Sequence, residues 1–434
     1  MSMALVGVLG IVVLMAVLFL MHMPVGFAMA MVGFCGVLLV ISPQAALGML
    51  GTEVWRIFSS YGLTVIPLFI LMGEICFYAG VSERLYNAAY KWMGSIRGGI
   101  AMATVMASAG FAAICGSNTA TAATMSTVAL PEMKRYNYDK VLSTGAVASG
   151  STLGVVIPPS VILIIIGLYT GQSITKLFFG GIGPGVFLTL LFILTIYILC
   201  HRHPDWGPTG PRTSWVEKVK ALPGAIEMFV LFSLVMGGLY LGWFTPSEAG
   251  AAGAFGALVI SLLGRKLTWE KFVAAVVDTL RISCMIMVIV TGAVIFGRFL
   301  TVTRLPYDAA SWVASLPIPH TVILSIVLLI YIIGGAVMDA LAFLLITLPI
   351  FFPMATKMGY DPIWFGVLIT VVTTMGAVTP PVGVNTYVVA GIAKDVPLGS
   401  VFKGVTYFLP AYVVCMILMM AFPSLVLFLP NTLR

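Results

Sequence analysis

The sequence predicts an all-α polytopic membrane protein, built as an inverted structural repeat with two re-entrant helical hairpins and two broken transmembrane helices. Three observations support this fold class: the composition, the length of the apolar stretches, and a pattern that recurs 222 residues later. Of 434 residues, 60% are hydrophobic and 9% are charged. A soluble chain is about 45–50% apolar and about 25% charged. This composition excludes a soluble enzyme or a soluble nucleic-acid-binding protein.

The chain contains twelve apolar stretches, and each bilayer crossing needs roughly 20 apolar residues. The first stretch lacks a basic start and a cleavage site, so we expect a retained span rather than a signal peptide. Two blocks are too long for one crossing, so each is either two crossings or a hairpin that turns back. The stretches are roughly 3–21, 24–41, 54–80, 98–131, 140–172, 176–200, 222–243, 247–263, 272–300, 320–356, 361–393 and 404–429.

The basic residues decide between these alternatives. If both long blocks, 98–131 and 320–356, are hairpins, 15 of the 22 basic residues face the cytoplasm, six face the opposite side, and Arg281 lies within a span. Such an asymmetry favours the hairpins under the positive-inside rule. The basic residues are scattered between apolar segments rather than gathered in a patch, so we expect no nucleic-acid partner. The six are Arg56, Lys176, Arg298, Arg304, Lys357 and Arg434.

An internal repeat supports the same topology. At an offset of 222, residues 131–161 lie over 353–383 with 8 identities in 31 positions, and 84–96 lie over 304–316 at an offset of 220. The charge assignment gives the two copies opposite orientations. Inverted repeats with interrupted helices are typical of secondary transporters; a parallel duplication with a structural role is the alternative.

Each repeat contains a double proline inside an apolar span. Proline has no N–H, so these pairs release the carbonyls of Gly154, Val155, Gly376 and Ala377. Oxygen atoms suit Na⁺, and the half-helices that begin near Ser160 and Val382 attract anions. A plain kink is the alternative for any one proline. The predicted helix breaks are Pro158, Pro159, Pro380 and Pro381.

Polar residues near the middle of the hairpin blocks are candidate binding groups. The run Ser117-Asn118-Thr119 is more polar than helix packing needs, and Asp339 aligns with Ser117. An acidic residue at that depth indicates function, here cation binding, with a structural carboxylate as the alternative. Asn385 and Thr386 follow the second break.

Arg298 ends an apolar span, where it either extends to the membrane interface or faces inward as a fork for a carboxylate. Glu74, Asp278 and Arg281 are weaker candidates of this kind.

Transition-metal and enzyme sites are not expected. The six cysteines lie far apart without a CxxC pair, and we expect His201 and His203 in a solvated loop. The sequence contains no HExxH motif, so it does not favour a membrane-embedded metalloprotease.

The chain resembles the large membrane (DctM-type) subunit of TRAP transporters, the tripartite ATP-independent periplasmic transporters of the ion-transporter superfamily. The resemblance rests on GSNTATA, LGVVIPPS, GGAVMDALAF and MGAVTPPVGVN. It implies an elevator-type transporter, coupling to a Na⁺ gradient without ATP, a periplasmic substrate-binding protein and a small four-helix membrane subunit. It also implies a multi-pass protein in the lipid bilayer of a bacterial or archaeal cytoplasmic (inner) membrane.

The same resemblance implies the site residues. Sodium site 1 would comprise Ser117, Asn118, Gly154 and Val156, and sodium site 2 would comprise Gly335, Asp339, Gly376, Thr379 and Val382. The residues expected at the substrate are Asn118, Thr119, Ser160, Arg298, Asn385 and Thr386.

The domain organisation follows from the repeat. We expect N-terminal scaffold helices (1–83), a first repeat (84–200), a cytoplasmic linker (201–221), further scaffold helices (222–303), a second repeat (304–403) and a C-terminal span (404–434).

The predicted function is sodium-driven import of an organic acid, a carboxylate such as a C4-dicarboxylate, sialic acid or a keto acid, delivered by the binding protein. The alternative is a stand-alone ion-coupled carboxylate symporter of the same superfamily that works without a binding protein.

Overall fold

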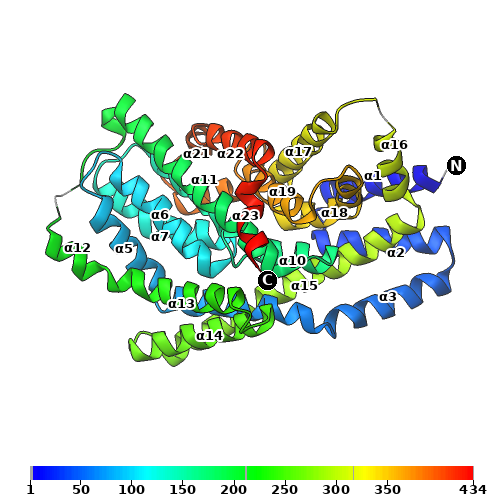
Figure 1. Cartoon of the computed structure of the whole chain (residues 1–434), viewed down its shortest axis with the longest axis horizontal. Coiled ribbons are helices and arrows are strands. Elements are labelled where there is room, and N and C mark those ends of the chain that lie inside the picture. The colour runs from blue at the N-terminus through cyan, green and yellow to red at the C-terminus, as the bar shows by residue number, and fades with distance from the viewer. Residues whose placement is uncertain (1–2, 211–212, 316, 434) are drawn as a thin grey trace.

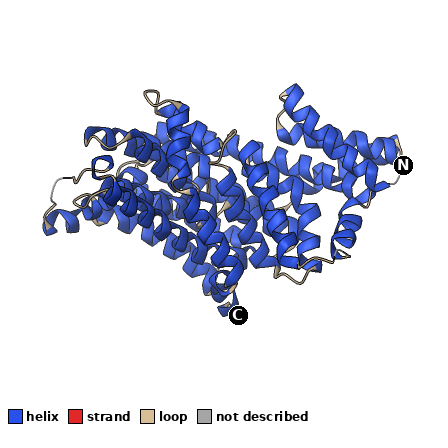
Figure 2. Cartoon of the chain, turned by 90° about the horizontal axis from the view of Figure 1, so that it is seen from above, coloured by secondary structure: helices blue, strands red, loops and turns tan. Residues whose placement is uncertain are grey.

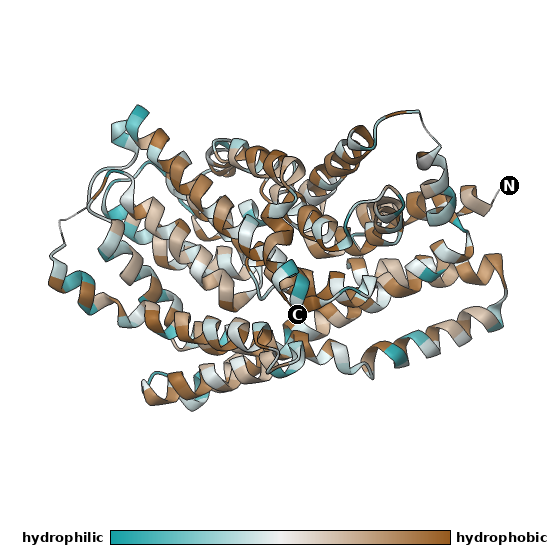
Figure 3. Ribbon diagram, viewed as in Figure 1, coloured by the Kyte–Doolittle hydropathy of each residue, from teal (hydrophilic) through white to brown (hydrophobic). Residues whose placement is uncertain are grey.

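The computed structural model describes residues 3–210, 213–315 and 317–433, and within these it consists of helices without strands (Figure 2). Arg434, one of the six basic residues assigned to the outer side, lies outside them. Ten helical segments are long and apolar enough to cross a membrane. Apolar residues run along most helices (Figure 3), and Leu39 and Leu263 are 82% and 79% exposed. Such exposure suits lipid and confirms the polytopic membrane protein.

The first helices, over residues 3–58, extend to one end of the long axis in Figure 1. They include a helix over residues 43–58, most of which lies between the apolar stretches expected over 24–41 and 54–80. Its first turn is capped by Ser42, whose Oγ accepts a hydrogen bond from the Ala45 N–H at 3.2 Å. The bounds are α1 Met3–Met21, α2 Val25–Val40, α3 Pro43–Phe58, η1 Tyr61–Thr64 and α4 Val65–Tyr78.

The first repeat contains the predicted arm, hairpin and broken helix. Gly116, with φ 64°, reverses the chain at the tip of the hairpin. The bounds are α5 Val81–Met93, α6 Gly99–Cys115, α7 Asn118–Arg135, α8 Lys140–Ser151, α9 Leu153–Val156, α10 Val161–Thr170 and α11 Ile174–Arg202.

The region between the repeats is partly helical even within the predicted linker. A capping box formed by Ser214 and Glu217 begins α12 there. The bounds are η2 Pro204–Trp206, α12 Trp215–Ala221, α13 Pro223–Tyr240, α14 Pro246–Leu263 and α15 Trp269–Val302. With 34 residues, α15 is roughly 50 Å long and borders both cavities described below.

The second repeat has the same order of elements. Asp139 and Asp361 begin the equivalent helices α8 and α19, and the Oδ1 atom of each accepts two backbone N–H bonds, at 2.8 and 3.2 Å and at 2.8 and 3.0 Å. The aligned sequences therefore fold alike. The bounds are α16 Leu305–Ala314, α17 His320–Val337, α18 Ala340–Lys357, α19 Pro362–Gly376 and α20 Val384–Ile392.

The C-terminal stretch differs from the single span expected over 404–429. It forms α21 Leu398–Thr406, α22 Leu409–Ala421 and α23 Ser424–Thr432. Pro410 lies at the start of α22 and Pro423 immediately before α23. Proline favours a helix start and disfavours helix continuation, which explains both interruptions.

Candidate functional site

The two hairpin tips share one structural role. The Ser117 Oγ caps α7 by accepting a hydrogen bond from the Ala120 N–H at 3.4 Å. The Asp339 Oδ1 caps α18 by accepting from Leu341 and Ala342 N–H groups at 3.0 and 3.4 Å. Both caps satisfy N–H groups that a helix start leaves free. The predicted alignment of Asp339 with Ser117 therefore holds in the fold.

Both tips line a single cavity of about 380 Å³. Ser117, Asn118 and Thr119 contribute from the first hairpin, and Asp339 contributes from the second. The Asn118 Oδ1 accepts a bond from the Thr119 N–H at 2.9 Å, and the Thr119 hydroxyl lies 3.2 Å from the Ser117 hydroxyl. The cavity therefore places a carboxylate, an amide and two hydroxyls around one space.

The opposite wall comes from helices outside the repeats. Glu74 of α4 lines the cavity, together with Ile282, Met285 and Ile286 of α15. Among the lining residues Glu74 and Asp339 are acidic and none is basic. Glu74 was a weak candidate in the sequence. The apolar α15 residues carried no signal, because they resemble any other membrane helix.

The first hairpin is fastened to the first helix break. The Val161 N–H donates to the Gly116 carbonyl at 3.4 Å. A Cβ on Gly154 would lie 2.5 Å from the Ser117 carbonyl oxygen, so only glycine fits there. Ser117 and Gly154 of predicted sodium site 1 thus lie together, and Asn118 adjoins them. The Val156 carbonyl faces Gly181 of α11, whose Cβ would lie 2.6 Å away.

The second hairpin is fastened to the second break in the same way. The Ala336 carbonyl accepts bonds from the Val382 and Gly383 N–H groups at 3.0 and 3.1 Å. A Cβ on Gly376 would lie 2.7 Å from the Gly335 carbonyl carbon. Gly335, Gly376, Thr379 and Val382 of predicted sodium site 2 therefore surround one junction, while Asp339 lines the cavity at the hairpin tip.

The breaks themselves are present, but most of the released carbonyls have protein partners. The Val155 oxygen accepts the Ser160 hydroxyl at 2.6 Å. The oxygens of Gly376 and Ala377 accept the N–H groups of Thr379 and Asn385 at 2.8 and 3.0 Å. The expectation of unpaired oxygens was wrong for these three. Ser160 and Asn385, which follow the proline pairs, supply donors to Val155 and Ala377, and Thr379, which precedes the second pair, supplies the donor to Gly376.

The half-helix starts also differ in part from the prediction. Ser160 caps α10 as expected, accepting from the Leu163 N–H at 3.4 Å. The second half-helix begins at Val384 rather than near Val382, because Gly383 adopts φ 56° and serves as its N-cap. Ser160 itself is fully buried beside the cavity, whereas Val161 and Ile162 line it.

The remaining predicted substrate residues lie elsewhere. Asn385 and Thr386 are fully buried and do not line the cavity. The Asn385 amide donates to Ser151 Oγ at 2.9 Å, and the Thr386 hydroxyl donates to the Val378 carbonyl at 3.0 Å. Arg298 lines a separate cavity, where its Nε donates to Glu53 Oε1 at 2.6 Å. The structure therefore brings only Asn118 and Thr119 to the hairpin-tip cavity.

The chain is similar to proteins of known family over most of its length. The family model described as "Tripartite ATP-independent periplasmic transporter, DctM component" matches residues 12–425. A C4-dicarboxylate TRAP transporter large permease protein of Pseudomonas aeruginosa is 34% identical, with 91% of this chain and 92% of that protein covered. A sialic acid TRAP transporter large permease protein of Vibrio cholerae is 28% identical, with 94% and 95% covered.

A solved structure shares the fold. The YdaH transporter of Alcanivorax borkumensis matches with a TM-score of 0.60 and 13% identity, over 89% of this chain and 91% of that one. The relatives are named as transporter permeases rather than enzymes.

Proposed function

The chain belongs to the DctM component family of tripartite ATP-independent periplasmic transporters, and from this membership we propose that it imports an organic acid at the expense of a sodium gradient, without ATP. The substrates named for relatives vary and include a C4-dicarboxylate and sialic acid, which are carboxylates, as well as isethionate and ectoine. A small carboxylate is therefore the proposed substrate class.

One observation carries this proposal: the two hairpin tips, each fastened to a broken helix, line one cavity. We propose that sodium site 1 is formed by Ser117, Asn118, Gly154 and Val156. Sodium site 2 is proposed at Gly335, Asp339, Gly376, Thr379 and Val382. Carbonyl, amide and carboxylate oxygens are suitable ligands for a hard cation. A carbonyl that accepts one hydrogen bond retains a second lone pair for an ion.

The substrate lies in the cavity itself, against Asn118 and Thr119. Bound Na⁺ offsets the charge of Asp339 and allows an anion to approach the tips. We propose an elevator movement in which the hairpins, α8–α10 and α19–α20 slide against α4 and α15. The cavity lies between these two groups of helices, so such a movement would carry the substrate across the membrane.

The proposed partners follow from the family. A small four-helix membrane subunit completes the membrane complex, and a periplasmic substrate-binding protein delivers the acid. We place the complex in the cytoplasmic (inner) membrane of a bacterium or archaeon.

Proteoliposomes test this function. The chain is reconstituted with its small subunit, and uptake of labelled succinate and sialic acid is measured under an inward Na⁺ gradient, with and without the binding protein. We expect uptake of an acid only with both the gradient and the binding protein. An equal K⁺ gradient is the matched control. Equal uptake under the Na⁺ and K⁺ gradients contradicts sodium coupling. Uptake without the binding protein favours the stand-alone symporter.

A further inference from the structure

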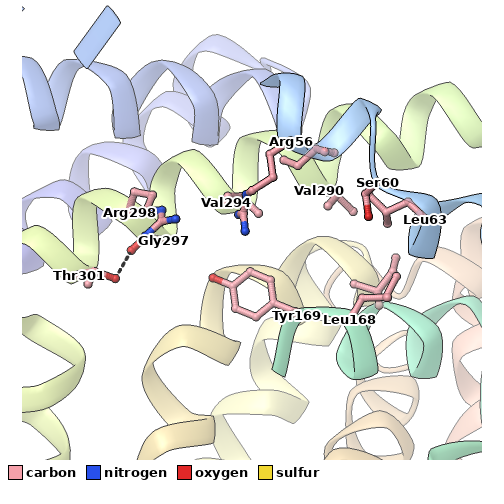
Figure 4. A pocket seen from close by; sticks show the side chains of 12 residues that line it. Arg56, Ser60, Leu63, Leu168, Tyr169, Val290, Val294, Gly297, Arg298 and Thr301 are labelled. Atoms are coloured by element: carbon pink, nitrogen blue, oxygen red, sulfur yellow. Dashed lines mark hydrogen bonds between the residues drawn. The ribbon is translucent and has the colours of Figure 1, made fainter. Parts of the chain in front are cut away.

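A second cavity, of about 360 Å³, lies between α3, α10 and α15. Arg56 of α3 and Arg298 of α15 extend into it from one side, and Tyr169 of α10 faces them from the other (Figure 4). Arg56 and Arg298 belong to the six basic residues that the charge asymmetry assigns to the outer side. The cavity therefore lies toward the side from which an imported substrate arrives.

The cavity contains more positive than negative charge. Glu53, 5% exposed, is the acidic residue at this cluster. Its Oε1 accepts the Arg298 Nε at 2.6 Å, and its Oε2 accepts the Arg56 Nη2 at 2.7 Å. Two guanidinium groups share one carboxylate, which leaves a net charge of +1. The arginine side chains are 60% and 51% exposed, so this charge is accessible from the cavity.

Hydrogen-bond donors remain available there. Within the described residues, neither Nη atom of Arg298 has an acceptor, and neither does the Nη1 of Arg56. The Tyr169 hydroxyl likewise forms no hydrogen bond with the described residues, although it borders the same space. Guanidinium nitrogen atoms in a fork and a phenolic O–H are donors suited to a carboxylate.

The two cavities follow one another along the same helices. On α10, Val161 and Ile162 line the hairpin-tip cavity, while Leu168 and Tyr169 line the second cavity about two turns further on. On α15 the order is the same, from Ile286 in the first to Val290 in the second. The second cavity therefore lies on the interface that leads to the hairpin tips.

We propose that the cavity between Arg56, Arg298 and Tyr169 is an entry site, which binds the anionic group of the substrate before it reaches the hairpin tips. The inference rests on the proposed import of an organic acid. Glu53 holds the two guanidinium groups in place and competes with the incoming anion. The sodium sites play no part here, so binding at this cavity requires no Na⁺.

Two substitutions that should change succinate affinity in opposite directions test the site. Binding of labelled succinate to the purified chain is measured in detergent with K⁺ and no Na⁺. Arg56→Gln removes a charged donor and weakens binding roughly tenfold. Glu53→Gln removes the competing charge and strengthens binding. Lys271→Gln, an exposed residue of α15 outside both cavities, is the matched control and leaves binding unchanged.

Unchanged succinate affinity in both Arg56→Gln and Glu53→Gln overturns the proposal, as does absence of saturable binding in the unmodified chain. Succinamide, the neutral isostere, should not compete. If Glu53→Gln fails to fold, Arg298→Gln, which keeps Glu53 and removes one charged donor, should bind more weakly than the unmodified chain. Saturable binding of phosphatidylglycerol in mixed detergent micelles that is tighter than that of succinate and is lost in Arg56→Gln assigns the cavity to a lipid headgroup and overturns the proposal as well.

A third variant separates this inference from the proposed function. Asp339→Asn should abolish Na⁺-dependent uptake and leave Na⁺-independent succinate binding intact. If Asp339→Asn retains Na⁺-dependent uptake, the proposed sodium site is contradicted and the entry site is not. If Asp339→Asn loses uptake but Arg56→Gln binds succinate with normal affinity, the entry site is contradicted and the sodium site is not.

Discussion

Ser117 and Asp339, 222 positions apart, begin equivalent helices at the two hairpin tips and line the same cavity. The first uses a hydroxyl and the second a carboxylate for the same capping bond. A neutral side chain would suffice as a cap, since serine, asparagine and aspartate are about equally good there. The charge at position 339 therefore needs another explanation, and cation binding supplies one.

Asp339→Asn isolates this charge. Asparagine retains the cap, so we expect a normally folded protein whose uptake no longer depends on Na⁺ or falls by at least tenfold. The measurement is initial uptake rate against Na⁺ concentration in proteoliposomes. Asp205→Asn, at an exposed position of η2, is the control. A variant with the sodium dependence of the unmodified protein would show that Asp339 is only a cap.

Gly154→Ala tests the contact between hairpin and helix break. The new Cβ would lie 2.5 Å from the Ser117 carbonyl oxygen, so the tip must move away. Overpacking of this kind costs about 1–3 kcal/mol. We expect a lower thermal midpoint and a weaker stabilisation by NaCl than in the unmodified protein.

Gly391→Ala is the matched control, since its Cβ would meet no atom within 4 Å. It should retain or slightly raise the midpoint. Equal behaviour of the two alanine variants would show that the tip accommodates the methyl group.

Ser160→Ala tests the hydroxyl that spans the first break. Its Oγ donates to the Val155 carbonyl at 2.6 Å and accepts from the Leu163 N–H at 3.4 Å. Loss of both bonds at a fully buried position should lower stability by about 2–3 kcal/mol. Denaturant titration followed by tryptophan fluorescence measures the loss. Ser173→Ala removes a cap alone, at the exposed start of α11, and should cost about 1 kcal/mol. Equal losses would leave the Val155 bond without an energetic role.

The ion pair between Asp395 and Lys134 predicts a pH dependence. The hydrogen bond from Lys134 Nζ to Asp395 Oδ2, 2.7 Å long, lowers the pKa of the Asp395 carboxyl. A carboxyl whose pKa is lowered by folding stabilises the protein above its unfolded pKa, about 3.9, and this contribution is lost as pH falls through the folded value.

Asp395→Asn should therefore lower the thermal midpoint at pH 6, with the difference from the unmodified protein vanishing as the pH falls below about 4. Both residues are exposed, so the expected difference is small and should shrink in 1 M NaCl. A difference that persists unchanged at low pH would assign the effect to packing rather than charge.

The sequence predicted the repeat well because its markers are local. The prolines at the breaks, the N-cap carboxylates Asp139 and Asp361, and the polar tip at Ser117 each act on the backbone within a few residues. Their order along the chain is therefore enough to place arm, hairpin and broken helix.

Long-range pairing was less predictable. The partner of Arg298 is Glu53, which lies 245 positions earlier in α3, a helix that falls mostly between two of the expected apolar stretches. The rotation of α20 about its axis decides that Asn385 faces Ser151 rather than the cavity, and proline positions do not set that rotation. New donors after each break also cannot be located until the chain's return path is known.

The short helix α10 forms part of the wall of both cavities, with its start at the hairpin tips and its end beside Arg56 and Arg298. As a helix of 10 residues it moves as a stiff rod. Any shift that widens one chamber must therefore reshape the other, and thermodynamic linkage makes the influence of the two occupants on each other mutual.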